Sequence, residues 1–176
     1  MKNVLELLER TAARLPRQTA FADQQCSYDY QTVVNIAGSV GSALAANGDR
    51  NCPVAVLMER GAPCLVTLMG VLYSGNFYVV LDPEMPAERV NKILRTLQPT
   101  ALICDEAHKD DPAGLDYDGK VYSAEALAAG QAQPELLQTV RRRMIDTDPA
   151  YAIFTSGSTG TVSYTHLRAH ETPEHL

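Results

Sequence analysis

The sequence has no tryptophan, and aromatic side chains make up only 6% of its 176 residues. Positive charge is also in the minority, because 15 lysine and arginine residues are outnumbered by 21 aspartate and glutamate residues, for a formal net charge of -6. A nucleic-acid-binding surface needs a basic patch, commonly interleaved with aromatic side chains on which bases stack. We therefore expect no nucleic-acid partner.

Long apolar runs and paired cysteines are missing as well. No stretch approaches the roughly 18 consecutive apolar residues of a membrane-spanning helix, and the first residues, Met-Lys-Asn-Val-Leu-Glu, lack the apolar core of a signal peptide. The four cysteines, at positions 26, 52, 64 and 104, form no Cys-x-x-Cys pair and have no histidine at zinc-ligand spacing. We expect a cytoplasmic chain with reduced, partly buried thiols and no membrane association.

Short apolar segments alternate with amphipathic ones through the middle of the chain. Continuous apolar runs are typical of strands in a parallel sheet that is covered on both faces, and here they are residues 53–58, 77–81 and 100–104. Helical periodicity lies between them, over residues 61–74 and 86–98. This alternation indicates βαβ crossovers. The fold class is therefore predicted to be α/β, with a mainly parallel sheet and flanking helices.

The remaining segments also carry patterns that predict helices, strands and loops. An amphipathic helix is expected over residues 4–15, followed by two short strands and a second helix that ends near Gly48. In the helix over residues 61–74, the side chains expected to point inward are Leu65, Leu68, Met69 and Leu72. Residues 105–133 are polar and are expected to form a surface loop with a short strand and a small helix. Arg141, Arg142 and Arg143 are expected at a solvated helix C-terminus, where cations interact favourably with the dipole.

The most informative stretch is residues 151–160, Tyr-Ala-Ile-Phe-Thr-Ser-Gly-Ser-Thr-Gly. A short apolar strand runs directly into six residues that are all glycine, serine or threonine. Small residues let successive backbone N–H groups point into one concavity, and the hydroxyls add further donors. Such a loop suits a polyphosphate. The residues expected to bind it are Thr155, Ser156, Gly157, Ser158, Thr159 and Gly160.

A flexible linker is the alternative for this stretch, because linkers share its composition. A linker would follow polar residues and not the apolar end of a strand, so the position favours an anion site. The stretch is not a Walker A loop, since the lysine of the Gly-Lys-Ser/Thr ending is absent.

The six residues of the loop, preceded by Tyr151 and Phe154, resemble the phosphate-binding signature of the AMP-forming adenylate synthetases. This superfamily comprises acyl-CoA synthetases, luciferases and the amino-acid adenylation domains of nonribosomal peptide synthetases. Residues 72–89 are similar to the second core motif of amino-acid adenylation domains, a motif that is mainly structural in the family. The departures from that motif are Ser74, Asn76, Phe77 and Val80.

The resemblance implies an ATP-dependent, AMP-forming ligase that uses Mg²⁺. It would activate a carboxylate, in the first place an amino acid, as an acyl-adenylate and pass the acyl group to the thiol of a carrier-protein phosphopantetheine or of coenzyme A. The resemblance favours an amino-acid substrate because of the residue pattern Asp82-Pro83-x-x-Pro86-x-Glu88-Arg89. Two alternatives stay open: a fragment of an acyl- or aryl-CoA ligase, and a non-catalytic, truncated nucleotide-binding or interaction module.

The resemblance covers residues 1–160, the opening part of the large N-terminal domain. We assign no catalytic or metal-binding residue, because the lysine expected after the loop, the acidic Mg²⁺ ligand and the acyl pocket would all lie beyond Gly160. Residues 1–161 are thus expected to be a partial N-terminal adenylation (AMP-binding) domain, catalytically silent by itself.

Residues 162–176 are expected to be a non-native or disordered tail. They contain three of the four histidines and resemble a translated sequencing-adapter peptide, Val-Ser-Tyr-Thr-His-Leu-Arg-Ala-His-Glu-Thr. A metal site is the alternative, since His166 and His170 stand four residues apart and could share a helical face.

Overall fold

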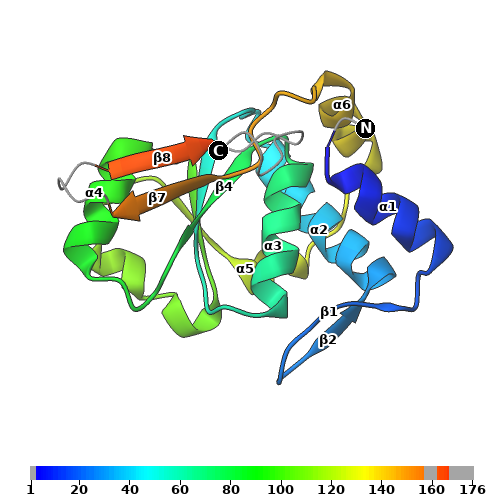
Figure 1. Cartoon of the computed structure of the whole chain (residues 1–176), viewed down its shortest axis with the longest axis horizontal. Helices are drawn as coiled ribbons and strands as arrows, with labels where there is room; N and C mark the ends of the chain where they lie inside the picture. Colours follow the sequence, from blue (N-terminus) through cyan, green and yellow to red (C-terminus); the bar gives the residue numbers. More distant parts are fainter. Residues whose placement is uncertain (1–2, 157–161, 167–176) are drawn as a thin grey trace.

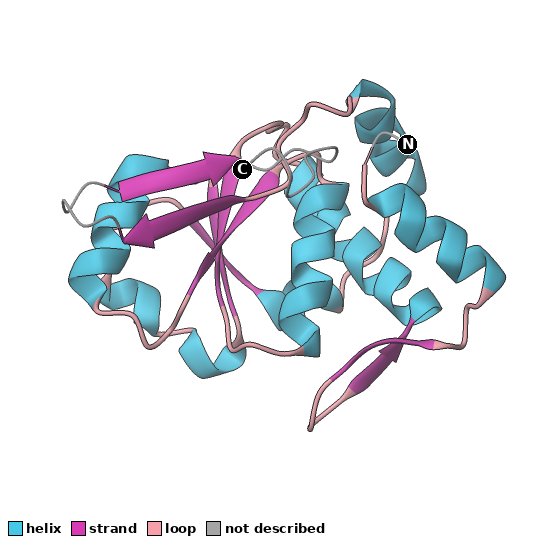
Figure 2. Cartoon of the chain, in the orientation of Figure 1, coloured by secondary structure: helices cyan, strands magenta, loops and turns pink. Residues whose placement is uncertain are grey.

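A four-stranded parallel sheet forms the centre of the molecule (Figures 1 and 2). The computed structural model describes residues 3–156 and 162–166. The strand order is β4-β3-β5-β6, and every neighbouring pair is parallel. The strands are β3 (Pro53–Leu57), β4 (Phe77–Leu81), β5 (Ala101–Cys104) and β6 (Lys120–Ser123). The predicted α/β class and mainly parallel sheet are confirmed.

Helices cover both faces of this sheet (Figure 1). They are α1 (Leu5–Arg14), α2 (Tyr30–Ala45), α3 (Ala62–Tyr73), α4 (Ala87–Leu97), α5 (Ala124–Ala128) and α6 (Pro134–Arg143), with short 3-10 turns at Glu106–His108 and Asp111–Gly114. Successive side chains of a strand point to opposite faces. Val54 and Val56 therefore pack with residues of α2 and α3, whereas Ala55 and Leu57 pack with Ile93 of α4. Two apolar cores result, one on each side of the sheet.

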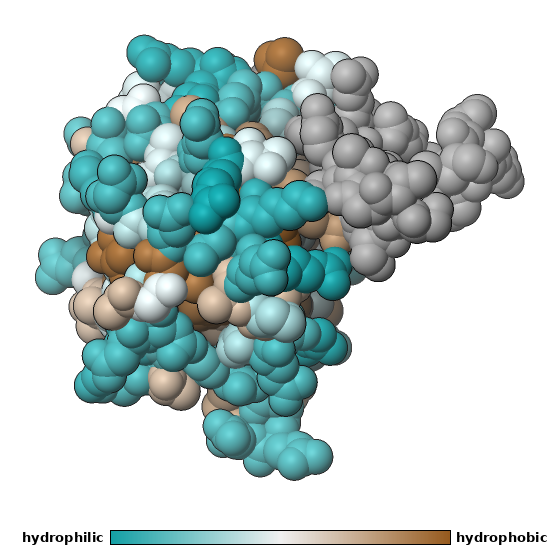
Figure 3. All heavy atoms as spheres, turned by 90° about the vertical axis from the view of Figure 1, so that its left-hand side faces the viewer, coloured by the Kyte–Doolittle hydropathy of each residue, from teal (hydrophilic) through white to brown (hydrophobic). Residues whose placement is uncertain are grey.

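The surface on the side of α4 is mainly hydrophilic, with apolar residues gathered near its middle (Figure 3). A cavity of about 250 Å³ opens beside α4, and Met85, Val90 and Leu115 are among the residues that line it. The same three side chains belong to, or pack against, the core between α4 and the sheet. This core therefore reaches the surface next to the start of α4.

Helices α2 and α3 pack closely through two glycines. A Cβ atom at Gly41 would lie 2.4 Å from Cβ of Tyr73, and one at Gly70 would lie 2.5 Å from Cβ of Val40. Both distances are far below van der Waals contact, so each position requires glycine. This close approach fixes α3 against α2, and both helices pack on the same face of the sheet.

The small antiparallel hairpin of β1 (Thr19–Ala22) and β2 (Ser27–Asp29) is tied to the start of α3. Its turn residue Asp23 accepts a hydrogen bond from the backbone N–H of Ala62 at 2.7 Å. This bond satisfies one of the N–H groups that a helix start leaves unpaired. Asp29 caps α2 in the same way, through the N–H of Thr32 at 2.8 Å.

Two expectations need correction. Leu65 does not point inward: 43% of its surface is exposed, because no element of the described chain covers that side of α3. The short strand in the polar segment is not part of a surface loop either. It is β6, which pairs with β5 over its full length and forms one edge of the central sheet.

The cysteines are as expected, because all four are free thiols and Cys64 and Cys104 are buried. Burial raises the pKa of the Cys64 thiol and raises that of Cys104 to about 12, so both are held protonated and unreactive. Within the described ranges, no helix combines the length and apolar character needed to cross a bilayer.

Candidate nucleotide-binding site

The predicted phosphate-binding stretch begins in a strand. Strand β7 (Ala152–Ser156) pairs antiparallel with β8 (Val162–His166), and the last pair in register is Ser156 with Val162. Thr155 and Ser156 therefore belong to the strand and not to the loop, because pairing with β8 extends β7 by two residues. Gly157, Ser158, Thr159 and Gly160 lie outside the described residues.

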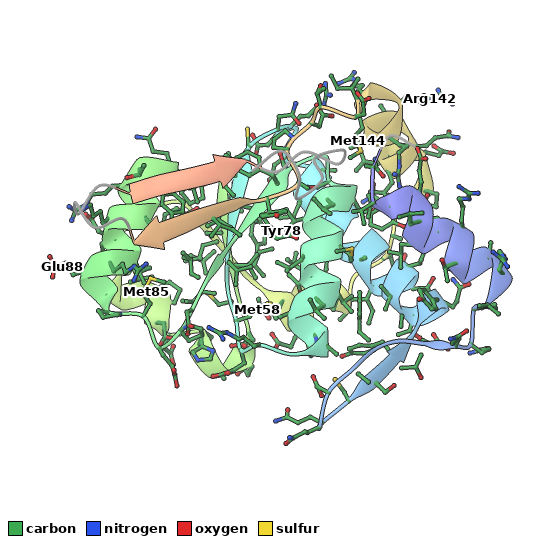
Figure 4. All side chains as sticks on the ribbon, viewed as in Figure 1. Met58, Tyr78, Met85, Glu88, Arg142 and Met144 are labelled. Carbon is green, nitrogen blue, oxygen red and sulfur yellow. The ribbon has the colours of Figure 1, made fainter. Side chains whose placement is uncertain are left out.

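The base of this strand pair is fixed to the edge of the central sheet. The backbone N–H of Tyr78 on β4 donates to the carbonyl of Ala150 at 3.2 Å, and Tyr78 forms a parallel bridge with Tyr151. The two tyrosine rings stack with their centroids 5.8 Å apart and their planes 16° apart. Tyr78 lies on β4 beside the start of β7 (Figure 4). The chain thus enters β7 in parallel with the main sheet.

One face of β7 is packed and the other is open. Ala152 is buried and Phe154 half-buried in the same core as Val79, Leu81 and α4. Ile153 points to the opposite face and is 49% exposed. The apolar residues that precede the loop hence serve as its anchor, as the sequence predicts for a strand that ends in a binding loop.

Two departures from the second motif, Ser74 and Asn76, contact each other. Asn76 is buried at the turn between α3 and β4, where its Oδ1 accepts from the N–H of Cys52 at 3.1 Å. Its Nδ2 donates to the hydroxyl of Ser74 at 3.0 Å, and that hydroxyl donates to the carbonyl of Val71 at 2.7 Å. The pair connects the start of β3 to the end of α3. Sequence reasoning noted both departures but could not see that they contact each other.

A cavity of about 650 Å³ opens at the carboxyl ends of β3 and β5, where the direction of strand addition reverses. Carboxylates line it, and Asp105 holds His108 through a 2.6 Å contact between Oδ1 and Nδ1. That hydrogen bond raises the pKa of His108. Across the described ranges, no group of three or more His, Cys, Asp or Glu side chains is placed to hold a metal ion. The backbone of His166 lies in β8, and His170 is outside the described residues, so the alternative of a histidine metal site is not tested.

The three arginines at the end of α6 differ in their surroundings. Arg141 is committed to α1 and the N-terminus: it contacts Glu9 at 2.6 Å and Asn3 at 2.6 Å, and its guanidinium lies 5.6 Å from the ring centre of Tyr73. Arg142 lies at the outer end of α6 (Figure 4) and is exposed, as is Arg143. The predicted helix C-terminus is confirmed, and Arg141 additionally joins α6 to α1.

Comparison with known proteins decides the family. A family model described as AMP-binding enzyme matches residues 8–166 of this chain. The chain belongs to the AMP-binding enzyme family. The predicted superfamily is thereby confirmed, and the match extends five residues past position 161, where we expect the native sequence to end.

Two large synthetases are similar to this AMP-binding chain. Pyochelin synthetase PchF of Pseudomonas aeruginosa is 35% identical over 147 residues, which is 83% of this chain and 8% of that protein. CymA of Salinispora arenicola, whose name describes a non-canonical nonribosomal peptide synthetase, is 32% identical over 155 residues, 88% of this chain and 2% of that protein. The AMP-binding chain therefore spans only a small part of these relatives.

Solved structures show the same fold. VinN superposes with a TM-score of 0.77 at 22% identity, covering 94% of the AMP-binding chain and 45% of VinN. The N-terminal subdomain of Klebsiella oxytoca NpsA, solved with 3-hydroxybenzoyl-AMSN, superposes with a TM-score of 0.74 at 19% identity. The superposition includes 96% of the AMP-binding chain and 41% of the NpsA subdomain.

Proposed function

We propose that this chain is the N-terminal part of an AMP-forming ligase that activates an amino acid. The observation that carries the proposal is the Gly/Ser/Thr loop on β7, in a chain whose residues 8–166 match the AMP-binding enzyme family. The synthetase names of the similar proteins, one of them a nonribosomal peptide synthetase, support an amino acid as the carboxylate over an acyl- or aryl-CoA substrate. Under this proposal, residues 1–161 are native domain sequence and residues 162–176 are a non-native tail.

The donor set of residues 155–160 fits the phosphates of ATP. Their four hydroxyls, two of them at the end of β7, and the backbone N–H groups of small residues carry no negative charge that would repel a polyphosphate. When bound, ATP supplies the α-phosphorus that the carboxylate attacks, and the bond to pyrophosphate breaks. Residues 155–160 would hold the departing phosphates in line and stabilise their negative charge through hydrogen bonds. The described residues provide no metal cluster, so we assign none of them to Mg²⁺.

The second half-reaction needs a thiol. The sulfur of phosphopantetheine on a carrier protein, or of coenzyme A, attacks the acyl carbon, and AMP leaves. A carrier protein is the acceptor we favour, because the similar proteins include one named as a nonribosomal peptide synthetase. The chain itself contributes only the phosphate loop to this scheme. We therefore expect the 176-residue chain to be inactive. We also propose that the chain and its complete product reside in the cytoplasm.

The loop can be tested in the complete product encoded at the locus. Removing a donor that stabilises developing charge commonly slows a reaction by about 10²-fold. Ser158→Ala and Thr159→Ala should each slow amino-acid-dependent exchange of pyrophosphate into ATP by that order. The matched control is Thr96→Ala, which removes an exposed helical hydroxyl that donates to the carbonyl of Lys92 within its own helix. A rate of pyrophosphate exchange that neither substitution lowers would contradict the proposal.

A further inference from the structure

Tyr78 physically joins two segments that are far apart in the sequence. It belongs to residues 72–89, the second motif, and its ring stacks on that of Tyr151, the first residue of the stretch 151–160. The ring centroids are 5.8 Å apart and the ring planes are 16° apart. The backbone N–H of Tyr78 also donates to the carbonyl of Ala150 at 3.2 Å. A single residue of β4 therefore contacts the chain that enters β7 through both its backbone and its ring.

The Tyr78 ring is itself held by the helices on one face of the sheet. Alternation along β4 puts Phe77 and Val79 in the core with α4, so Tyr78 points to the face that α2 and α3 cover. There it is half-buried and packs against the core between the sheet and these helices. It also packs against the cluster that α1, α2 and α3 form. These contacts fix the ring on which Tyr151 rests.

The two faces of β7 are supported differently. On one face, Ala152 is buried and Phe154 packs in the core with α4. On the opposite face, Tyr151 stacks on Tyr78, and the next residue on that face, Ile153, is 49% exposed. Within the described part of the chain, the stack is thus the contact found that supports β7 from this side. The Tyr78 ring therefore limits how far β7 can tilt.

A small tilt at the stack becomes a large displacement at the phosphate donors. Thr155 lies four residues beyond Tyr151, which is about 13 Å along a strand at about 3.3 Å per residue. A tilt of about 10° over that length moves the backbone by about 2 Å. Binding groups must be held within about 0.5 Å of their productive positions. A tilt of this size is therefore enough to move the donors away from the phosphates.

We propose that Tyr78 is a positioning residue of the nucleotide site: its ring sets the angle at which β7 leaves the central sheet and so places the donors that follow for ATP. This role rests on the proposed function, because it needs a complete product that binds ATP. It differs from simple packing in what it predicts. Loss of packing lowers the amount of folded enzyme, whereas loss of positioning weakens the use of ATP by the enzyme that is folded.

Two substitutions that keep the backbone N–H of Tyr78 test its ring. In the complete product, Tyr78→Leu should raise KM for ATP in pyrophosphate exchange by about ten-fold or more. KM for the amino acid should change by less than about two-fold, since the amino acid does not bind the displaced donors. Tyr78→Phe keeps the stacking ring and should leave KM for ATP within about two-fold of the unsubstituted value.

Tyr122→Leu is the matched control. Tyr122 is also half-buried and packs against the same core as Tyr78, but it lies on β6, at the other edge of the sheet. Its substitution should lower Tm, as Tyr78→Leu does, and leave KM for ATP unchanged. A rise in KM for ATP in Tyr122→Leu equal to that in Tyr78→Leu would overturn the proposal, because it would be a general effect of lost packing.

Tyr151→Leu removes the same stack from the other strand and is the test variant if Tyr78→Leu does not fold. It should raise KM for ATP by the same factor, and the double substitution should be no worse than either single one, because all three remove one contact. An unchanged KM for ATP in these variants, or an equal rise in Tyr78→Phe, would overturn the proposal and leave the ligase assignment intact. A complete product that no amino acid stimulates would remove the proposed function and the role of Tyr78 together.

Discussion

The contact between α2 and α3 gives the sharpest stability prediction. Gly70→Ala places a Cβ 2.5 Å from both Cβ and Cγ1 of Val40 and 3.2 Å from the carbonyl oxygen of Ala37. Ordinary contacts begin near 3.4 Å, so the helices must separate by almost 1 Å. Overpacking of this kind costs about 1–3 kcal/mol, against a gain in helix propensity of about 1 kcal/mol over glycine. We expect a net loss of up to about 2 kcal/mol.

That loss should lower Tm of the chain by up to roughly 8 °C, since 1 kcal/mol shifts Tm by about 2–4 °C at this size. Thermal unfolding followed by circular dichroism measures it. Gly114→Ala is the control, because no atom lies within 4 Å of a Cβ at that position. If Gly70→Ala melts at the same temperature as Gly114→Ala, the close packing of α2 on α3 is wrong.

Three further predictions concern other parts of the chain. Asn76→Ala leaves the N–H of Cys52 without its acceptor and should destabilise the chain by about 1–3 kcal/mol in urea unfolding; an unchanged midpoint contradicts the buried bond. The N–H of Ala62, then those of Cys26 and Gln25, hold the pKa of Asp23 at about 2, below its ordinary 3.8, so its contribution to stability is present above 3.8 and is lost as pH falls through about 2. Asp23→Asn should flatten the acid limb of Tm against pH, and an unaltered limb argues against that cap. Mass spectrometry of loaded acceptors should find the acyl group on a carrier protein, and loading of coenzyme A alone contradicts amino-acid activation for peptide synthesis.

Local patterns were enough to predict most of the architecture. The apolar runs that became β3, β4 and β5 carry the periodicity of buried parallel strands, and Pro86 and Gly48 mark helix boundaries by backbone geometry. β6 was predicted to lie in a surface loop because Lys-Val-Tyr-Ser has the pattern of a surface strand. Only its pairing with β5 brings it into the central sheet. Its edge position, with solvent on one side, explains its polar composition.

Contacts between distant or mutually dependent residues were not predictable in this way. Ser74 and Asn76 stand where the motif has small residues, and they form a hydrogen bond with each other. The contribution of either side chain to stability therefore depends on the other. Leu65 was expected inside because it shares helical spacing with Leu68, Met69 and Leu72, yet no element of the described chain covers it. At the site, the sequence predicted the loop and its supporting strand, while the extension of β7 through Thr155 and Ser156 depends on pairing with β8.

The most direct test of the central claim is amino-acid-dependent exchange of labelled pyrophosphate into ATP, with the complete product of the locus and the 176-residue chain measured side by side. The account predicts exchange that one or a few amino acids stimulate in the complete product, and none in the short chain. Exchange by the short chain, or a complete product that no amino acid stimulates, would contradict it.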